Sequence, residues 1–250
     1  YSLTDMAWVG RLGSEAIAAV GSVGLLTWMT TSISLLNKVG SEVSVGQSIG
    51  MKDETAARCF ATHNLTLSLI ISLVWASVLF AFSVPIVDFY ELKSHIAQDA
   101  VNYLRTVSTA FPFVFMSAAA TGIFNASGRS KIPFTINGVG LVINMVLDPL
   151  FIFVFDWKTD GAAWATWIAQ ACVFASFVYQ LKFKQILWDN FRFFGKLTKR
   201  YTKRIIQIGL PVATLNTLFA FVNMFLGRTA STVGGHLGLL AMTTSGQIDA

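Results

Sequence analysis

The stretch FTINGVGLVINMVLDPLFIFVF, residues 134–155, decides the fold class of this chain. It contains one charged side chain, Asp148, and is otherwise almost wholly apolar. A run of about 20 apolar residues is long enough to cross a bilayer as a helix. An aspartate costs about 2.5–3.5 kcal/mol near the centre of such a helix. The stretch therefore predicts a membrane span whose single carboxylate is either compensated by neighbours or retained for a function.

The composition of the whole chain agrees with a membrane protein. Of the 250 residues, 54% are hydrophobic and 12% are charged, whereas soluble domains carry about 25% charged residues. The two cysteines and three histidines show no spacing typical of a disulfide framework or a metal site. Further apolar runs predict spans that end near Val9, run from about Ala16 to beyond Leu36, cover roughly 62–84, 100–124, 133–155, 161–181 and 205–227, and begin again near Leu237. We therefore expect an all-α integral membrane protein.

Basic residues are unequally divided between the two sets of predicted loops. Most of the 18 Lys and Arg residues fall in the loops around 52–58, 129–131 and 182–204. Loops rich in Lys and Arg stay in the cytoplasm, so these three loops are predicted to be cytoplasmic. Residues 182–204, KFKQILWDNFRFFGKLTKRYTKR, also interleave aromatic and basic side chains. Such a pattern can bind nucleic acid, but next to membrane spans we favour contact with anionic lipid headgroups and expect no nucleic-acid partner.

Two short segments near the ends of the chain resemble each other. TDMAWVGRLG, residues 4–13, and VNMFLGRTASTVGG, residues 222–235, both place a polar residue and a Met before Gly-Arg. About six spans separate the copies, which gives them the same orientation, as in transporters built from parallel repeats. The chain starts and ends inside apolar segments, so we expect a fragment. It is predicted to comprise a six-helix lobe at 1–181, a cytoplasmic linker at 182–204 and the start of a second lobe at 205–250.

Polar residues inside the spans are the candidates for chemistry. Asn144 and Asp148 are four residues apart and project from one helix face, and Pro149 leaves the carbonyl of Met145 without its helical partner. A carboxylate, an amide and a freed carbonyl make a plausible cation or proton site. Further polar residues that could join the site are Asp5, Tyr103, Asn137 and Thr166. For a lone Asn such as Asn137, helix packing is the more common role.

Six segments together resemble the multidrug and toxic compound extrusion family. They are DMAWVGRLGSEAIAAVG at 5–21, GQSIGMKDETAAR at 46–58, GIFNASGRSKIP at 122–133, NMVLDPLFIF at 144–153, DGAAWATWIAQ at 160–170 and IIQIGLP at 205–211. The resemblance covers essentially the whole chain. It implies a two-lobe transporter of twelve helices, of which this chain holds the first six, helix 7 and the start of helix 8.

The family resemblance also implies which residues act. It assigns a cation-binding or coupling site, with sodium possible, to Asp5, Asn144, Asp148 and Thr166. It places Tyr103 nearby, and Asn137 is a further candidate for contact with substrate or with these ligands. Asn223 stands where the repeat would place a counterpart of Asp5, so the second copy is neutral at this position.

The function implied by the resemblance is antiport. We expect an exporter of drugs or toxic organic cations that is driven by protons or sodium, needs no cofactor and is not an enzyme. We expect it in the bacterial cytoplasmic membrane, in contact with lipid, and active as a monomer when full length. A flippase for a lipid-linked sugar or another lipid is the alternative, although the sequence offers only Lys38 and Arg105 as bases within the spans.

Overall fold

The computed structural model describes residues 7–92, 94–184, 186–189 and 191–248 of the chain. Within these residues the regular structure is helical, and no strand occurs. The helices in chain order are η1 (Gly10–Leu12), α2 (Ser14–Gly50), α3 (Glu54–Ala81), α4 (Ser83–Asp88), α5 (Ser94–Ser108), α6 (Phe111–Ala126), α7 (Lys131–Pro149), η2 (Leu150–Val154), α8 (Lys158–Val178), η3 (Tyr179–Phe183) and α9 (Lys199–Ile248).

The long helices confirm the predicted membrane architecture. Five helices of the described residues are long and apolar enough to cross a bilayer, and the bent pair α5 and α6 makes a sixth candidate. The pair bends by 47° between Ser108 and Phe111, where the sequence alone predicted one continuous span. Pro112 lies in the first turn of α6. Proline lacks an N–H, so α5 cannot continue through Pro112 with its hydrogen bonds intact, whereas a proline is tolerated in the first turn of a new helix such as α6.

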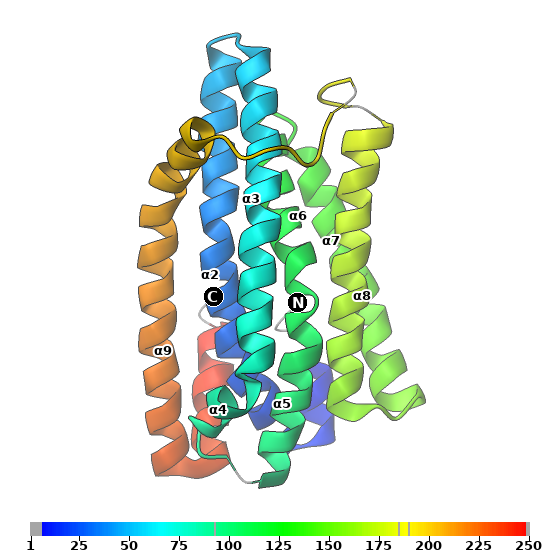
Figure 1. Cartoon of the computed structure of the whole chain (residues 1–250). Coiled ribbons are helices and arrows are strands. Elements are labelled where there is room, and N and C mark those ends of the chain that lie inside the picture. The colour runs from blue at the N-terminus through cyan, green and yellow to red at the C-terminus, as the bar shows by residue number, and fades with distance from the viewer. Residues whose placement is uncertain (1–6, 93, 185, 190, 249–250) are drawn as a thin grey trace.

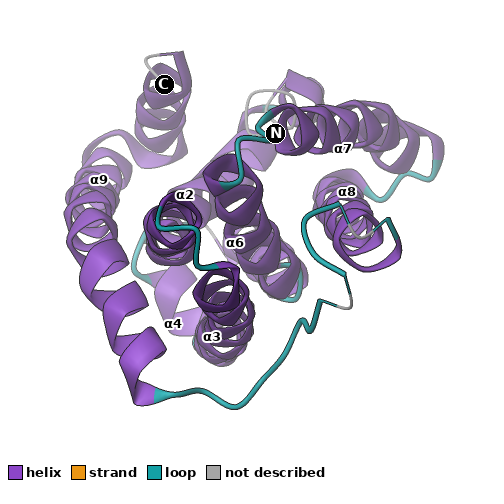
Figure 2. Cartoon of the chain, turned by 90° about the horizontal axis from the view of Figure 1, so that it is seen from above, coloured by secondary structure: helices purple, strands orange, loops and turns teal. Residues whose placement is uncertain are grey.

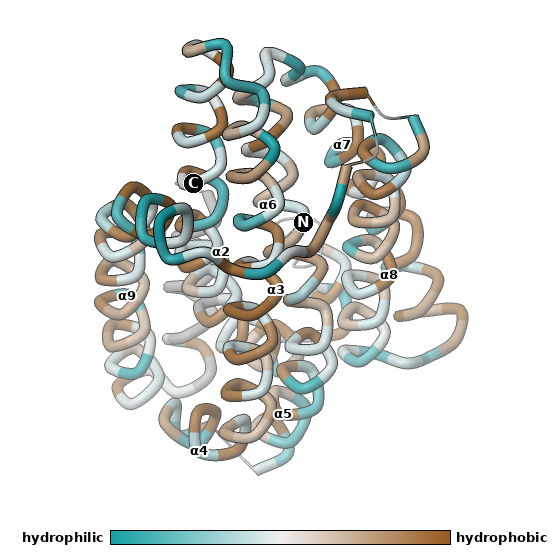
Figure 3. The backbone as a smooth tube through the Cα atoms, turned by 45° about the horizontal axis from the view of Figure 1, so that its top comes forward, coloured by the Kyte–Doolittle hydropathy of each residue, from teal (hydrophilic) through white to brown (hydrophobic). Residues whose placement is uncertain are grey.

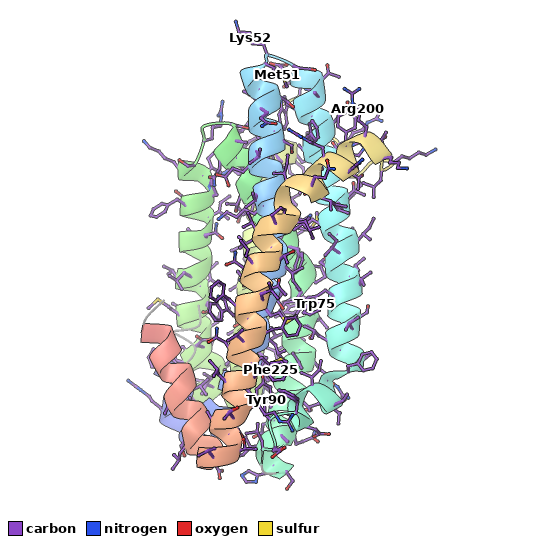
Figure 4. The ribbon with its side chains drawn as sticks, turned by 90° about the vertical axis from the view of Figure 1, so that its left-hand side faces the viewer. Met51, Lys52, Trp75, Tyr90, Arg200 and Phe225 are labelled. Carbon is purple, nitrogen blue, oxygen red and sulfur yellow. The ribbon has the colours of Figure 1, made fainter. Side chains whose placement is uncertain are left out.

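The spans form an upright bundle (Figure 1). The turn between α2 and α3 lies at the top of the figure, and so do the described residues of the segment 184–198, which are 184, 186–189 and 191–198. Seen from above, that segment runs around the outside of α3 from the end of α8 to the start of α9 (Figure 2). Hydrophilic residues occur at this end of the bundle, and hydrophobic residues predominate along the helices between its two ends (Figure 3). We call this end the basic end, because it carries basic residues such as Lys52 and Arg200 (Figure 4).

Helix α9 packs along α2, and small residues allow the two backbones to approach closely. A Cβ atom at Gly209 of α9 would overlap the carbonyl oxygen of Leu36 on α2, and one at Gly40 would lie 2.8 Å from Cγ2 of Ile205. A Cβ at Gly122 of α6 would likewise overlap the carbonyl oxygen of Lys38. The α2 segment 36–40 is therefore the point where α6 and α9 meet the central helix. Small residues serve the same purpose in other membrane bundles.

An amide pair joins α2 to α3 beside this meeting point. Asn64 Nδ2 donates to the carbonyl oxygen of Asn37 at 2.7 Å, and Asn37 Nδ2 donates to the carbonyl oxygen of Asn64 at 3.3 Å. Both side chains are fully buried. Because polar groups in a membrane bundle need partners inside the protein, this reciprocal pair holds the two helices in one register.

The other end of α9 bends. Gly235 has φ 59° and ψ −149°, which is not helical, so α9 consists of two helices that meet at a kink. The positive φ explains the glycine, because other residues rarely adopt it. The predicted start of an eighth span near Leu237 lies just beyond this kink.

Candidate functional site

The centre of the candidate site lies on α7, one turn before its end. Asn144 and Asp148 are both fully buried, and Asn144 Nδ2 donates to Asp148 Oδ1 at 3.2 Å. The four-residue spacing thus places the amide and the carboxylate on the inner face of the helix, away from lipid. Removing a carboxylate from water is costly, and this bond stabilises its charge.

The helix changes its geometry directly after the carboxylate. Pro149 ends the regular α-helix, and Leu150–Val154 form a π-helical turn in which the Phe155 N–H donates to the carbonyl oxygen of Leu150 at 3.1 Å. Pro149 cannot donate to the carbonyl of Met145. Single π-helical turns inside α-helices are frequent at functional sites. The sequence indicated the missing proline donor but not the wider turn.

Helix α8 contributes a hydroxyl to the same place. Thr166 is half-buried, and its Oγ1 lies 3.5 Å from Asn144 Nδ2, at the limit of a hydrogen bond. The amide of Asn144 therefore stands between a carboxylate on its own helix and a hydroxyl on the next. Three of the predicted cation ligands, Asn144, Asp148 and Thr166, come together in this way.

Tyr103 of α5 lies in the core that covers this end of α7 and α8. It is 5% exposed and belongs to the same packed cluster as Val9, Ile152 and Ala163. Ile152 follows Asp148 by one turn, and Ala163 precedes Thr166 by one turn. Tyr103 therefore shares a packed core with residues one turn away from the candidate ligands.

Asp5 and Asn137 are the remaining predicted site residues. Asp5 lies outside the described residues. Asn137 is described, and its Nδ2 donates to the carbonyl oxygen of Pro133 at 2.8 Å, two turns towards the basic end from Asn144. There it lines a groove between α6 and α7, of about 680 Å³, together with Thr121 and Asn125. The structure does not bring Asn137 to the Asn144–Asp148 pair.

Residues 8 and 9 also pack near the candidate site. The Trp8 ring meets the Phe153 ring edge-on at 6.2 Å, and Val9 is fully buried in the cluster that contains Tyr103. The first described residues of the chain therefore lie against the end of the span that carries Asp148.

Comparison with known proteins places these observations in one family. A model of the MatE family matches residues 1–150. The chain is 30% identical over 261 aligned residues to the "Probable multidrug resistance protein YoeA" of Bacillus subtilis, an alignment that covers 96% of this chain and 55% of that protein. The chain thus spans about half the length of the curated relatives it matches.

Two solved structures share the fold. A multidrug resistance MATE family transporter in its inward-facing conformation overlays with a TM-score of 0.92 at 25% identity, over 99% of this chain and 57% of the other. A transporter of the MOP superfamily from Pyrococcus furiosus, described as having a binding pocket of reverse polarity, overlays at 0.86 with 26% identity, over 100% and 55% of the two chains.

Proposed function

The chain belongs to the MatE family, and from that membership we propose that the whole protein exports drugs or other organic cations in exchange for a proton or a sodium ion. The observation that carries the proposal is the fully buried Asp148 with its bonded partner Asn144. An acid held inside a membrane bundle is costly, and such residues typically serve proton or ion pathways. The related protein of Bacillus subtilis is named for multidrug resistance, which supports the substrate class.

The proposed coupling site consists of Asp148, Asn144 and Thr166, with Asp5 as a further ligand. In the structure the Asn144 NH2 group donates to the carboxylate and stabilises its charge. A sodium ion requires oxygen ligands. Rotating the amide by half a turn would present its oxygen in place of its nitrogen without changing its shape. Exchange of the coupling ion would then be linked to one rotation of Asn144.

Ion binding at the proposed site drives transport by shifting the balance between two arrangements of the bundle. With its ion bound, the lobe favours one arrangement of the bundle, and without the ion it favours the other. The overlay with an inward-facing transporter supports an arrangement that is open at the basic end, which we place in the cytoplasm. The protein would lie in the bacterial cytoplasmic membrane and act as a monomer.

An efflux assay tests the proposal. Cells that carry the full-length protein are loaded with ethidium, and its export is followed while the sodium and pH gradients are varied separately. Asp148→Asn keeps the shape of the side chain and removes its charge, so we expect export to fall to the level of cells without the protein.

The matched control for this assay is Asp156→Asn. Asp156 is exposed just after the same helix and has φ 54°, a conformation that Asn also tolerates. We expect this variant to export normally. Normal export by Asp148→Asn, with unchanged dependence on both gradients, would show that the coupling site lies elsewhere.

A lipid flippase remains the second candidate, because the Pyrococcus furiosus structure shows that the fold also carries a pocket of reversed polarity. A flippase of an anionic lipid would use bases inside the bundle. Arg105 is engaged elsewhere, since its Nε donates to Ser83 Oγ at 2.9 Å and its guanidinium lies over Phe80. Movement of a fluorescent lipid without export of any cation would favour this function.

A further inference from the structure

The end of the bundle opposite the basic end contains a contact between three consecutive loop residues and one face of α9. The loop residues are Phe89, Tyr90 and Glu91, between α4 and α5, and the α9 residues are Phe225, Arg228 and Ser231. Because residues 225, 228 and 231 follow one another at three-residue intervals, their side chains share a helix face. We call these six residues the outer clasp. Figure 4 shows Tyr90 and Phe225 next to each other beside the lower part of α9, before its kink at Gly235.

Each loop residue of the outer clasp uses a different kind of contact. Arg228 Nη2 donates to Glu91 Oε1 at 3.1 Å, and the same guanidinium lies 4.5 Å from the centroid of the Phe89 ring. Phe89 meets Phe225 edge-on at 5.7 Å, and Ser231 Oγ donates to the carbonyl oxygen of Tyr90 at 2.5 Å. Arg228 is therefore the residue that makes two of the contacts at once.

The loop conformation shows that these contacts hold it in place. Glu91 has φ 53°, a left-handed conformation that is uncommon for residues other than Gly, Asn and Asp. Such conformations persist where surrounding contacts over-determine them. Tyr90 next to it is fully buried although it lies in a connecting segment. The loop is thus fitted against α9.

The contacts of α9 at its two ends differ in kind. Near the basic end, Gly209 lies against the backbone of Leu36 and Ile205 packs against Gly40, so the helices touch along rigid main chain. At the outer clasp, the contact depends on side chains, and those of Arg228 and Glu91 remain 43% and 52% exposed. Exposed ion pairs are weak and open readily. The tight contact is suited to be a pivot and the clasp to be the part that opens.

We propose that the outer clasp holds the outer side of the transport pathway closed, and that its opening lets α9 swing away from the first lobe about the contact at residues 36–40. This inference rests on the proposed function, in which α9 begins a second lobe. Arg228 and Glu91 are then positioning residues of the transport cycle: they do not touch the coupling ion or the substrate but set how often the outer side is open.

The test measures how easily a buried site on α9 is reached from outside. Ala220 is 2% exposed and lies on α9 between the pivot and the clasp. In full-length protein lacking Cys59 and Cys172, Ala220→Cys is labelled in intact cells by a membrane-impermeant thiol reagent. The reaction rate reports the fraction of molecules that are open on the outer side.

Graded effects are expected from the two clasp variants. Arg228→Gln removes both the ion pair and the contact with Phe89, and exposed contacts of these kinds together correspond to about a 3- to 30-fold shift in the open fraction. Glu91→Gln removes the ion pair alone and should raise the rate by about 1.5- to 5-fold. The rates should therefore rise in the order unchanged protein, Glu91→Gln, Arg228→Gln.

The matched control is Glu15→Gln. Glu15 pairs with His95 at 3.0 Å at the same end of the bundle, but both residues lie within the first lobe. Its loss should leave the labelling rate unchanged. Equal rates in all three variants, or an equal rise with Glu15→Gln, would overturn the proposal, because the clasp would then not control access. Size-exclusion profiles identify any variant that is misfolded.

The labelling result does not depend on export. If the clasp variants raise the labelling rate while the unchanged protein exports no cation, the result supports the proposal for the outer clasp and contradicts the proposed function. If the protein exports cations but the labelling rates of the clasp variants do not change, the result supports the proposed function and contradicts the proposal for the outer clasp. In an active exporter, Arg228→Gln should also change the maximal export rate more than the half-saturating substrate concentration, because it alters the conformational step and not the binding site.

Discussion

Replacing Gly209 by Ala should separate α9 from α2 at the proposed pivot. The added Cβ atom would overlap the carbonyl oxygen of Leu36 and would lie 2.8 Å from its carbonyl carbon. These are backbone atoms of a long helix, so they cannot move aside as a flexible side chain would. The whole of α9 must shift instead, and the contact between Gly40 and Ile205 must shift with it.

The size of the effect follows from two opposing terms. Overpacking a well-packed interface costs about 1–3 kcal/mol, while replacing glycine by alanine inside a helix stabilises by about 1 kcal/mol. Gly24→Ala on α2 isolates the second term, because a Cβ at Gly24 has no neighbour within 4 Å among the described residues. Both variants gain the same helix propensity. The difference between them is therefore the steric cost, and at about 2 °C per kcal/mol for a large chain it corresponds to a melting temperature about 2–6 °C lower for Gly209→Ala.

Thermal unfolding of the full-length protein in detergent measures this difference. Cys59 and Cys172 are half-buried and free, so a maleimide dye that fluoresces on reaction reports their exposure as the protein unfolds. If Gly209→Ala melts at the same temperature as Gly24→Ala, the backbones of α2 and α9 do not touch at this point, and the pivot described above does not exist.

Two further predictions concern buried polar groups. Asn64→Leu should destabilise the protein by about 1–3 kcal/mol, because it leaves the buried amide of Asn37 without its partner, whereas Asn37→Leu with Asn64→Leu should recover most of that loss in the same melting assay. Burial raises the pKa of the Tyr90 phenol above its usual value of 10.0. The stability that depends on its neutral form is complete below pH 10 and is lost as the pH rises further. Tyr90→Phe should therefore lose less stability than the unchanged protein above pH 10, and equal losses would contradict the burial of this phenol.

The spans and the inward direction of Asp148 could be predicted from local sequence. Apolar length alone places the membrane helices, and the four-residue spacing places Asn144 beside Asp148. The same spacing argument fails for Asn137, which shares that face of α7 but lies two turns away beside the groove between α6 and α7. Shared helix face is a local property, whereas contact depends on which other helix covers each turn.

The remaining features depend on partners that are distant in sequence. Nothing near Asn37 indicates that Asn64 will pair with it, and nothing near Glu91 indicates that Arg228 will reach it. The sequence offered Thr166 as one of several polar residues that could join Asn144, and only the family resemblance assigned it to the site. The bend before α6 did have a local signal in Pro112, which the apolar pattern around it concealed.

The segment after α8 is fastened to α3 by three hydrogen bonds at regular intervals. Arg58 Nη2 donates to the carbonyl oxygen of Asp189, Thr62 Oγ1 donates to that of Arg192, and the Gly195 N–H donates to Thr66 Oγ1. The partners are 129–131 positions apart in the sequence.

This separation has a consequence for biogenesis. The α3 side chains are synthesised long before the segment that they bind, so the fastening can form only after α4 to α8 have been made. Chains generally fold domain by domain from the N-terminus during synthesis. The fastening is therefore a late step in the assembly of the first lobe.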